Sequence, residues 1–291
     1  MTRVAAVDIG ATSGRVMLAE LTDDGPTLHE VRRFPNQPRQ EGDRWVWDVS
    51  ALRDEIQAGV LAAHAMGAQS VGIDTWAVDY GVVRDGALVG PVGAYRDPRH
   101  VAGVDLVDRR IAWSSLYGIT GIQRMPINTV YQIATDDPQR LVAGSTFLMV
   151  PDLLAWMLTG VMATDVTNAS STGMVDPRTR QWSPVVLDAL GLEPSCFLAT
   201  DEPGSIRGAF AGMGDLPLIG VATHDTASAF AGAPLVDRDS SLVCSLGTWA
   251  LVGAEAVGAV PDEQAQARNI THELGVDGTV RLLRNVCGMW L

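Results

Sequence analysis

The segment Thr223-His224-Asp225-Thr226 brings together side chains that can exchange protons or bind hydroxyl groups. It follows an apolar run that predicts a strand and precedes a run of small residues that predicts a helix. A carboxylate at such a junction can accept a proton from a substrate hydroxyl during phosphoryl transfer, so Asp225 is the candidate proton acceptor. The alternative is that Asp225 only caps the helix, which is a common role for aspartate.

A glycine-containing turn near the N-terminus, Gly10-Ala11-Thr12-Ser13-Gly14-Arg15, has the composition of a phosphate-binding loop. Its glycines allow a tight turn that exposes backbone N–H groups to an anion. Its threonine and serine add hydroxyl donors, and its arginine adds positive charge. Asp8 precedes the turn and can hold Mg²⁺ through water, because this ion keeps much of its hydration shell. The alternative is an ordinary hairpin turn.

A second turn of the same kind, Leu246-Gly247-Thr248-Trp249, lies between two later apolar runs. A Gly-Thr pair in a turn has a structural role more often than a functional one. The pairing of the two turns carries the argument, because two glycine turns that face each other across a cleft can hold a polyphosphate from both sides. We therefore take Gly247 and Thr248 as candidate nucleotide contacts.

Several polar and aromatic residues are suited to binding a sugar. The segment Ile73-Asp74-Thr75-Trp76-Ala77-Val78-Asp79 ends a predicted strand with two carboxylates and an indole, which match the hydroxyl groups and apolar faces of carbohydrates. Tyr95-Arg96-Asp97 can form another edge of the site, but a structural Arg–Asp pair explains it equally well. Asn285 is either a site residue or part of a turn.

Composition excludes several classes of protein. The chain has 291 residues, of which 47% are apolar and 19% charged, so it is not a disordered protein. All 21 basic residues are arginine. This excludes Walker-type loops, Schiff-base enzymes and protein kinases, which need a lysine. The net charge of −13 argues against a nucleic-acid partner.

No segment predicts secretion or membrane insertion. The first apolar run is too short for a signal peptide. The most apolar stretch, 147–163, is interrupted by Pro151-Asp152 and predicts a buried core helix rather than a membrane span. Three cysteines are too few for a disulfide framework or a metal cluster. We therefore predict a cytoplasmic protein with no membrane partner.

The helices and strands predicted around these residues form an α/β pattern. Ser50 is the predicted cap of a helix that runs to about Met66, with Asp54 and Glu55 in its first turn. The stretch 102–200 is mainly helical. Short apolar runs predict strands, at residues 3–8, 15–20, 28–34, 70–76, 216–223, 241–245 and 249–253.

The first two strands form a hairpin around the first glycine turn, and the last two form a hairpin around the second. This repetition suggests a duplicated fold. Residues 232–239 contain Pro234 and several charges and make the best domain boundary. We predict one domain over residues 1–234 and the beginning of a second over 235–291.

Together these segments resemble the FGGY family of carbohydrate kinases, and within it the members that phosphorylate L-rhamnulose. The matches are colinear from end to end, which is more specific than any one motif. They fall on residues 7–18, 72–76, 94–97, 128–132, 224–228, 247–249, 269–271 and 285–291.

The resemblance implies two domains of the actin-like ATPase (ribonuclease H-like) fold, with ATP and the sugar in the cleft between them. The family's phosphate loop falls on residues 11–15, its ATP-contacting threonine on Thr248 and its proton acceptor on Asp225. Its sugar contacts fall on His224, Thr226, Asn285 and Ala77. Ala77 replaces a glycine of the family pattern, and its methyl group can tighten the pocket or change which ketose fits.

The implied activity is the ATP- and Mg²⁺-dependent conversion of L-rhamnulose to its 1-phosphate in rhamnose catabolism, with fuculose and xylulose as competing substrates. Family members extend well beyond residue 291, so the sequence resembles a truncated kinase whose second domain is incomplete. One alternative is therefore a sugar-binding remnant without kinase activity. Another is an actin-like ATPase that acts as a chaperone or filament and needs no sugar pocket.

Overall fold

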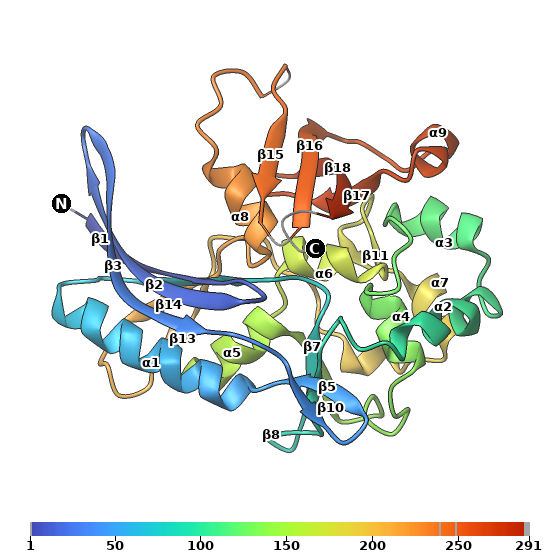
Figure 1. Ribbon diagram of the computed structural model, residues 1–291, viewed down its shortest axis with the longest axis horizontal. Coiled ribbons are helices and arrows are strands. Elements are labelled where there is room, and N and C mark those ends of the chain that lie inside the picture. The colour runs from blue at the N-terminus through green and yellow to red at the C-terminus, as the bar shows by residue number, and fades with distance from the viewer. Residues whose placement is uncertain (1, 239, 248, 288–291) are drawn as a thin grey trace.

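A six-stranded sheet forms the centre of the computed structural model, which describes residues 2–238, 240–247 and 249–287. Its strand order is β13-β14-β6-β1-β2-β3 (Figure 1). β1 is parallel to β6 and β6 is parallel to β14, whereas the other neighbours are antiparallel. The strands are β1 (Thr2–Ile9), β2 (Ser13–Thr22), β3 (Gly25–Pro35), β6 (Val71–Thr75), β13 (Ile206–Ala209) and β14 (Pro217–Ile219).

The predicted hairpin of residues 3–8 and 15–20 is confirmed, as β1 and β2, and so are the strands at 28–34 and 70–76. The strand predicted at 216–223 is too long, because β14 ends at Ile219. Beyond that point the chain still runs beside β6, where Thr75 N donates a 2.9 Å hydrogen bond to Thr223 O.

Helix α1 (Val49–Ala65) packs against one face of this sheet, together with α5 (Val150–Thr159) (Figure 1). The predicted helix is confirmed, but its predicted cap is wrong. Asp48, two residues before Ser50, accepts a 3.0 Å hydrogen bond from Ala51 N. The helix therefore begins earlier than predicted, and Asp54 and Glu55 lie outside its first turn.

The helical stretch predicted at residues 102–200 is confirmed, although its first helix begins at His100, and it packs around a second apolar core that contains Phe147. The helix predicted at 147–163 begins only at Val150, because residues 145–149 pair with β7 as a strand. The helices are α2 (His100–Asp108), α3 (Trp113–Thr120), α4 (Thr129–Ala134), α6 (Val166–Ala169) and α7 (Pro184–Leu190), with 3-10 turns at Ser170–Thr172 and Pro194–Cys196.

Three small sheets border this helical region. Their strand orders are β10-β7-β8, β11-β12 and β4-β5-β9. Their strands are β4 (Arg39–Glu41), β5 (Arg44–Trp47), β7 (Tyr80–Arg84), β8 (Ala87–Leu88), β9 (Val92–Gly93), β10 (Ser145–Met149), β11 (Val175–Asp176) and β12 (Gln181–Trp182).

A four-stranded antiparallel sheet of order β15-β16-β18-β17 lies across from the central sheet, with α8 (Asp225–Gly232) beside it (Figure 1). The predicted later strand pair is confirmed, although β16 is longer than expected. Its core consists of Phe230, Leu251 and Leu283. The elements are β15 (Val243–Leu246), β16 (Trp249–Val257), α9 (Glu263–Ala267), β17 (Thr271–Leu274) and β18 (Thr279–Cys287). None of the helices among the described residues is both long and apolar enough to span a membrane.

Candidate active site

Three carboxylates meet at one edge of the central sheet. Asp8 in β1 lies opposite Asp74 in the neighbouring parallel strand β6. His224, the residue before Asp225, forms a parallel bridge with Thr75 at the end of the same strand. Because the carboxyl ends of parallel strands meet at the same edge of a sheet, all three side chains reach one cavity. The cavity has a volume of about 820 Å³.

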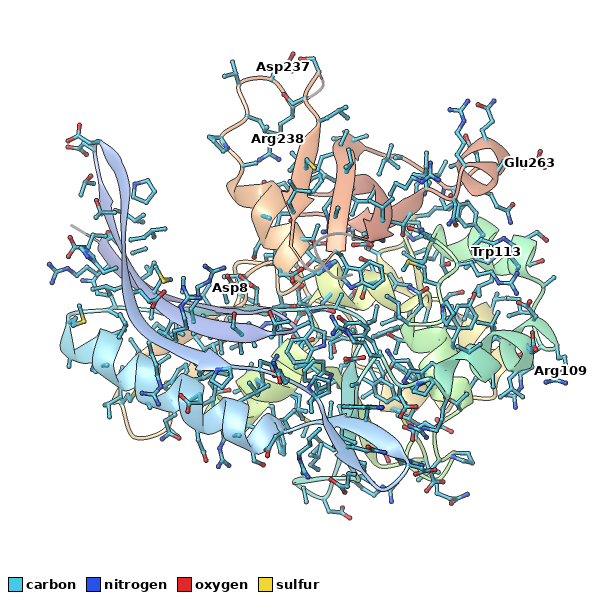
Figure 2. All side chains as sticks on the ribbon, viewed as in Figure 1. Asp8, Arg109, Trp113, Asp237, Arg238 and Glu263 are labelled. Carbon is cyan, nitrogen blue, oxygen red and sulfur yellow. The ribbon has the colours of Figure 1, made fainter. Side chains whose placement is uncertain are left out.

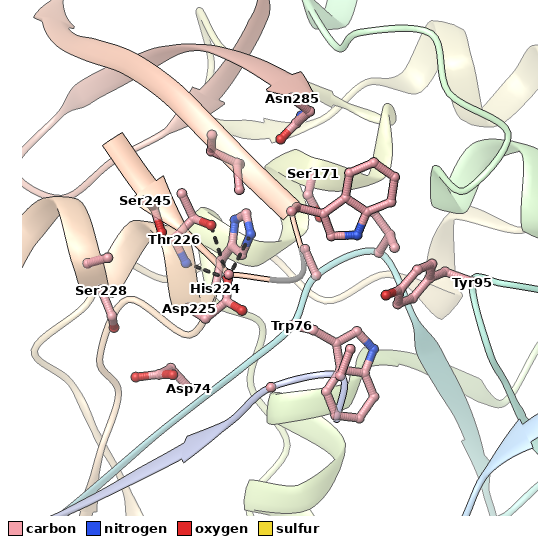
Figure 3. A pocket seen from close by; sticks show the side chains of 18 of the residues that line it. Asp74, Trp76, Tyr95, Ser171, His224, Asp225, Thr226, Ser228, Ser245 and Asn285 are labelled. Carbon is pink, nitrogen blue, oxygen red and sulfur yellow. Dashed lines mark hydrogen bonds and ion pairs between the residues drawn. The ribbon is translucent and has the colours of Figure 1, made fainter. Parts of the chain in front are cut away.

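The carboxylates influence one another's protonation. The pKa of Asp74 lies well above its ordinary value because the side chain is buried and because Asp8 and Asp225 add negative charge nearby. Burial also raises the pKa of Asp225, although the adjacent His224 and Thr226 oppose this effect. Figure 3 shows Asp74 and Asp225 on neighbouring sides of the cavity. Such clustered, perturbed acids in a cleft are typical of functional sites.

Asp225 is not the cap of α8. The N-cap position belongs to His224, which makes no side-chain cap hydrogen bond, and Asp225 is the first residue of the helix. Asp225 Oδ1 accepts hydrogen bonds of 2.5 Å from Thr226 N and 3.1 Å from Thr226 Oγ1. The carboxylate therefore lines the cavity beside His224 and Thr226, as Figure 3 shows.

The first glycine turn closes one side of the cavity. Gly10 N donates a 2.9 Å hydrogen bond to Ser13 O, and Asn36 supports the turn by donating a 2.7 Å bond from Nδ2 to Gly10 O. Ala11, Thr12 and Ser13 line the cavity, together with Arg15.

Gly14 belongs to the same turn but does not appear among the lining residues. A Cβ added to Gly14 would lie 2.2 Å from Phe34 Cε2, so this glycine permits close packing of the hairpin rather than contact with a ligand.

Asp8 and Arg15 face each other across the hairpin that carries this turn. The register of β1 and β2 places them directly opposite, and Arg15 Nη2 lies 2.8 Å from Asp8 Oδ2. Figure 2 labels Asp8 at the end of the sheet, on the side that faces α8. The candidate metal ligand and the candidate phosphate ligand are therefore ion-paired with each other.

The second sheet lines the opposite side of the cavity with one of its faces. Side chains alternate between the two faces of a strand, and the register pairs Leu251 with Asn285 and with Ser245, so all three share a face. Gly247 N donates a 2.8 Å hydrogen bond to Trp249 O and closes the second glycine turn. The lining residues from this sheet are Ser245, Gly247, Trp249, Leu251, Glu273 and Asn285.

Thr248, the candidate ATP contact, lies outside the described residues. Asn285 is held through its backbone, since its N–H donates a 3.2 Å hydrogen bond to Gln123 Oε1. This leaves the Asn285 side chain facing the cavity, as Figure 3 shows.

Trp76 and Tyr95 form an aromatic wall of the cavity, and Ala77 lines the cavity beside them. Next to them, Val78 has a φ of 69°, a left-handed backbone conformation that costs energy for a β-branched residue. Thr129 Oγ1 donates a 2.6 Å hydrogen bond to Val78 O and helps to hold this conformation. Strained residues of this kind concentrate at functional sites.

The structure does not place Asp79 in the cavity. Its side chain is fully buried behind the aromatic wall, where it accepts hydrogen bonds from Trp76 Nε1 at 2.9 Å and Trp47 Nε1 at 2.6 Å. It also accepts bonds from Tyr95 N and Gln132 Nε2. Asp79 therefore orients the wall instead of contacting a sugar directly, because four donors compete for its two oxygens.

Burial raises the pKa of Asp79 to about 6, even though hydrogen bonds from Trp76, Trp47, Gln132 and Tyr95 oppose the shift. Between pH 4 and 6 the folded protein therefore holds this proton more tightly than the unfolded chain. The contribution of Asp79 to the free energy of unfolding falls by about 3 kcal/mol as pH rises through that window.

We expect the Asp79→Asn variant to lose this pH dependence. Urea unfolding gives the free energy of unfolding of the wild type and of the variant at pH 4 and at pH 7. We expect the difference between the two proteins to change between these pH values. A difference that is equal at the two pH values would contradict the assignment.

Glu273 and Ser171 also line the cavity, although no motif in the sequence predicted either residue as part of the site. Glu273 is buried in β17, at a position fixed by the pairing of β17 with β18. Ser171 lies in a 3-10 turn after α6. The run Thr271-His272-Glu273-Leu274 carried no signal for this, because three of its four residues are polar and the burial of Glu273 comes from the pairing of β17 with β18.

The edge of the sheet at which Asp8, Asp74 and Asp225 meet is suited to a hydrated Mg²⁺ ion. Among residues 2–238, 240–247 and 249–287, no three His, Cys, Asp or Glu side chains are placed to hold an ion by themselves. Mg²⁺ usually keeps several waters and is bound through one or two carboxylates together with substrate phosphates. Asp8 is suited to this kind of binding, because its carboxylate lies beside the first glycine turn. It is also close enough to Asp74 to raise the pKa of that side chain.

The model for the N-terminal domain of the FGGY family of carbohydrate kinases matches residues 4–232, so the chain belongs to this family. Over 98% of its length the chain is 41% identical to the rhamnulokinase of Bacteroides thetaiotaomicron, of which it covers 61%. It is 39% identical to the rhamnulokinase of Enterococcus faecalis, again over 98% of the chain and over 60% of that protein. The chain thus spans about three fifths of the length of these curated relatives.

Solved structures share the fold at low sequence identity. The xylulose kinase of Lactobacillus acidophilus superimposes with a TM-score of 0.84 at 16% identity, covering 98% of this chain and 60% of that one. Plasmodium falciparum glycerol kinase with ADP superimposes with a TM-score of 0.81 at 15% identity. This match covers 99% of this chain and 61% of that one. The predicted α/β fold of the actin-like ATPase class is confirmed.

Proposed function

We propose that the chain phosphorylates a ketose with ATP, most specifically L-rhamnulose to L-rhamnulose 1-phosphate in rhamnose catabolism. The observation that carries the proposal is the placement of Asp225 in one cavity with both glycine turns. The choice of sugar is supported by the rhamnulokinases that the chain resembles at 37–41% identity. We extend the proposal to a cytoplasmic location, where ATP is available.

In the proposed mechanism Asp225 orients the attacking sugar hydroxyl and accepts its proton. A bond forms between that hydroxyl oxygen and the γ-phosphorus of ATP, while the bond from this phosphorus to the β–γ bridging oxygen breaks, which releases ADP. Burial raises the pKa of Asp225, which makes its ionised form a stronger proton acceptor. His224, Thr226 and Asn285 supply hydrogen-bonding groups for the sugar, and the Trp76 wall supplies an apolar surface.

The two glycine turns are the proposed phosphate contacts, through residues 11–13 on one side and Gly247 and Thr248 on the other. Arg15 can exchange its ion pair with Asp8 for a phosphate oxygen, because the pair is partly exposed. That exchange would leave the Asp8 carboxylate available to hydrated Mg²⁺, which would offset negative charge on the phosphates.

Calorimetric titration of the 291-residue chain with L-rhamnulose, followed by ATP and Mg²⁺, tests this proposal. Sugar-dependent ADP release is then measured with L-rhamnulose, fuculose and xylulose. We expect L-rhamnulose to bind and to give the fastest release. Failure of all three ketoses to bind would contradict the proposal.

A non-catalytic sugar-binding protein is the second candidate, because the proposed sugar contacts Trp76, His224 and Thr226 all line the cavity from within residues 4–232. Sugar binding without any affinity for ATP in the same titration would favour this candidate over the kinase.

A further inference from the structure

Glu273 is a buried carboxylate that no step of the proposed mechanism uses. It is 4% exposed, and it lines the cavity from β17. The register of β17 and β18 places it directly opposite Arg281, whose Nη2 lies 3.3 Å from Glu273 Oε2. Arg281 is itself fully buried. A carboxylate and a guanidinium that are buried together must be paired with each other. A third side chain also contacts this ion pair.

The third side chain is His224, whose ring lies between two carboxylates. His224 Nδ1 lies 3.2 Å from Glu273 Oε2, and His224 Nε2 lies 3.4 Å from Asp225 Oδ1. Figure 3 shows the ring of His224 beside Asp225 and Thr226. Residues from the second sheet and from the start of α8 therefore form one chain that ends at the proposed proton acceptor.

The charge on Glu273 determines which proton His224 can carry. Burial disfavours the ionised carboxylate, but the nearby His224 and the charge of Arg281 together hold the pKa of Glu273 below its ordinary value. Arg281 Nη2 lies 3.4 Å from His224 Nδ1 and can only donate. Nδ1 therefore faces an acceptor, Glu273, and a competing donor, Arg281. The ionised Glu273 favours a proton on Nδ1, because a carboxylate is a stronger acceptor than a neutral oxygen.

We propose that Glu273 is a positioning residue, which keeps a proton on His224 Nδ1 and so leaves His224 Nε2 as an acceptor for a hydroxyl group of the bound sugar. The groups that face His224 are Asp225 from α8, Glu273 from β17 and Arg281 from β18. Arg281 is fixed in turn by donating a 3.1 Å hydrogen bond to Leu274 O. Replacing Glu273 with glutamine leaves only a weaker, neutral acceptor beside His224 Nδ1. It also removes the charge that pairs with Arg281, so Arg281 Nη2 then donates to Nδ1 and Nδ1 loses its proton.

The ring ¹⁵N chemical shifts of His224 in the free chain test this directly, without any substrate. The His224 signals are assigned by their disappearance in His224→Gln. We expect a protonated Nδ1 in the wild type and an unprotonated Nδ1 in Glu273→Gln, with no change in Glu263→Gln, which alters an exposed carboxylate on α9 (Figure 2).

An unprotonated Nδ1 in the wild type would overturn the proposal, even if Glu273→Gln did not fold. Identical His224 shifts in the wild type and a folded Glu273→Gln would overturn it as well.

A second test rests on the proposed function and uses the dissociation constant for L-rhamnulose. We expect Glu273→Gln to weaken binding about tenfold, because His224 Nε2 is then no longer an acceptor for the sugar hydroxyl. In the His224→Gln background the same substitution should have no further effect, since a positioning residue acts only through its partner. Additive losses would mean that Glu273 contacts the sugar by itself and would overturn the proposal. If the wild type bound no L-rhamnulose, the proposed function would fail, while the shifts of His224 would still decide the role of Glu273.

Discussion

Asp225→Asn is expected to lower L-rhamnulose-dependent ADP release by about 100- to 10,000-fold, the range over which a positioned general base contributes. The amide is nearly the same size as the carboxylate and keeps a hydrogen-bonding oxygen, but it cannot take the proton of the attacking hydroxyl. Sugar binding depends mainly on the surrounding hydrogen-bonding groups and the aromatic wall. We therefore expect the dissociation constant for L-rhamnulose to change far less than turnover.

Steady-state release of ADP and calorimetric sugar titration, measured on the same preparations, separate these two effects. Asp24→Asn is the matched control, because Asp24 is exposed on the turn between β2 and β3 and lies outside the cavity lining. Full turnover by Asp225→Asn would remove Asp225 from its proposed role. An equal loss of sugar affinity and turnover would make it a binding residue only.

A buried ion pair lies beneath the site. Arg207 Nη1 lies against Asp152 Oδ1, and the two residues are 2% and 1% exposed. Burial raises the pKa of Asp152 to about 7, although Arg207 opposes the shift, so the carboxylate is ionised at pH 8. We expect Asp152→Asn to lower the free energy of unfolding at pH 8 by about 3–5 kcal/mol, because it leaves the Arg207 charge buried and uncompensated.

Urea unfolding at pH 8 measures this loss. The double variant Asp152→Asn/Arg207→Met is the matched control and should recover part of the stability, because it removes the orphaned charge. A double variant that is less stable than Asp152→Asn alone would contradict the ion-pair account.

This ion pair supports the site through Asp165. Asp165 N–H approaches both Asp152 oxygens at 3.3 Å, and Asp165 Oδ1 accepts hydrogen bonds from Thr223 N at 3.1 Å and Thr223 Oγ1 at 3.0 Å. Thr223 lies two residues before Asp225. The strand-to-helix junction that carries the proposed proton acceptor is therefore anchored in the buried core.

The sequence sufficed to predict features that depend on local chemistry. Glycines, small hydroxyl residues and flanking apolar runs indicated the two hairpin turns, and the Thr-His-Asp-Thr segment indicated the start of α8. The six-stranded sheet then placed Asp225 and the turn at 10–13 in one cavity. The assignment of ligands to these residues stays a proposal.

Features that depend on contacts between distant segments could not be predicted. Asp79 is fully buried because Trp47, 32 residues earlier, and Gln132, 53 residues later, both donate to it. Glu273 reaches the cavity only through the register of β17 with β18. Nothing in the local sequence around either carboxylate specifies these partners. The predicted cap of α1 is wrong for a local reason. Asp48 and Ser50 are both good N-cap residues, and the helix begins after the earlier one.

A crystal structure of the chain with L-rhamnulose and a non-hydrolysable ATP analogue would show whether Asp225 faces the sugar while the glycine turns hold the phosphates. We predict that one sugar hydroxyl lies about 2.6–3.2 Å from the Asp225 carboxylate, the distance that proton transfer requires. We also predict that the phosphates of the analogue contact the turn at residues 10–13. A sugar bound outside the cavity, or phosphates bound away from both glycine turns, would contradict the account.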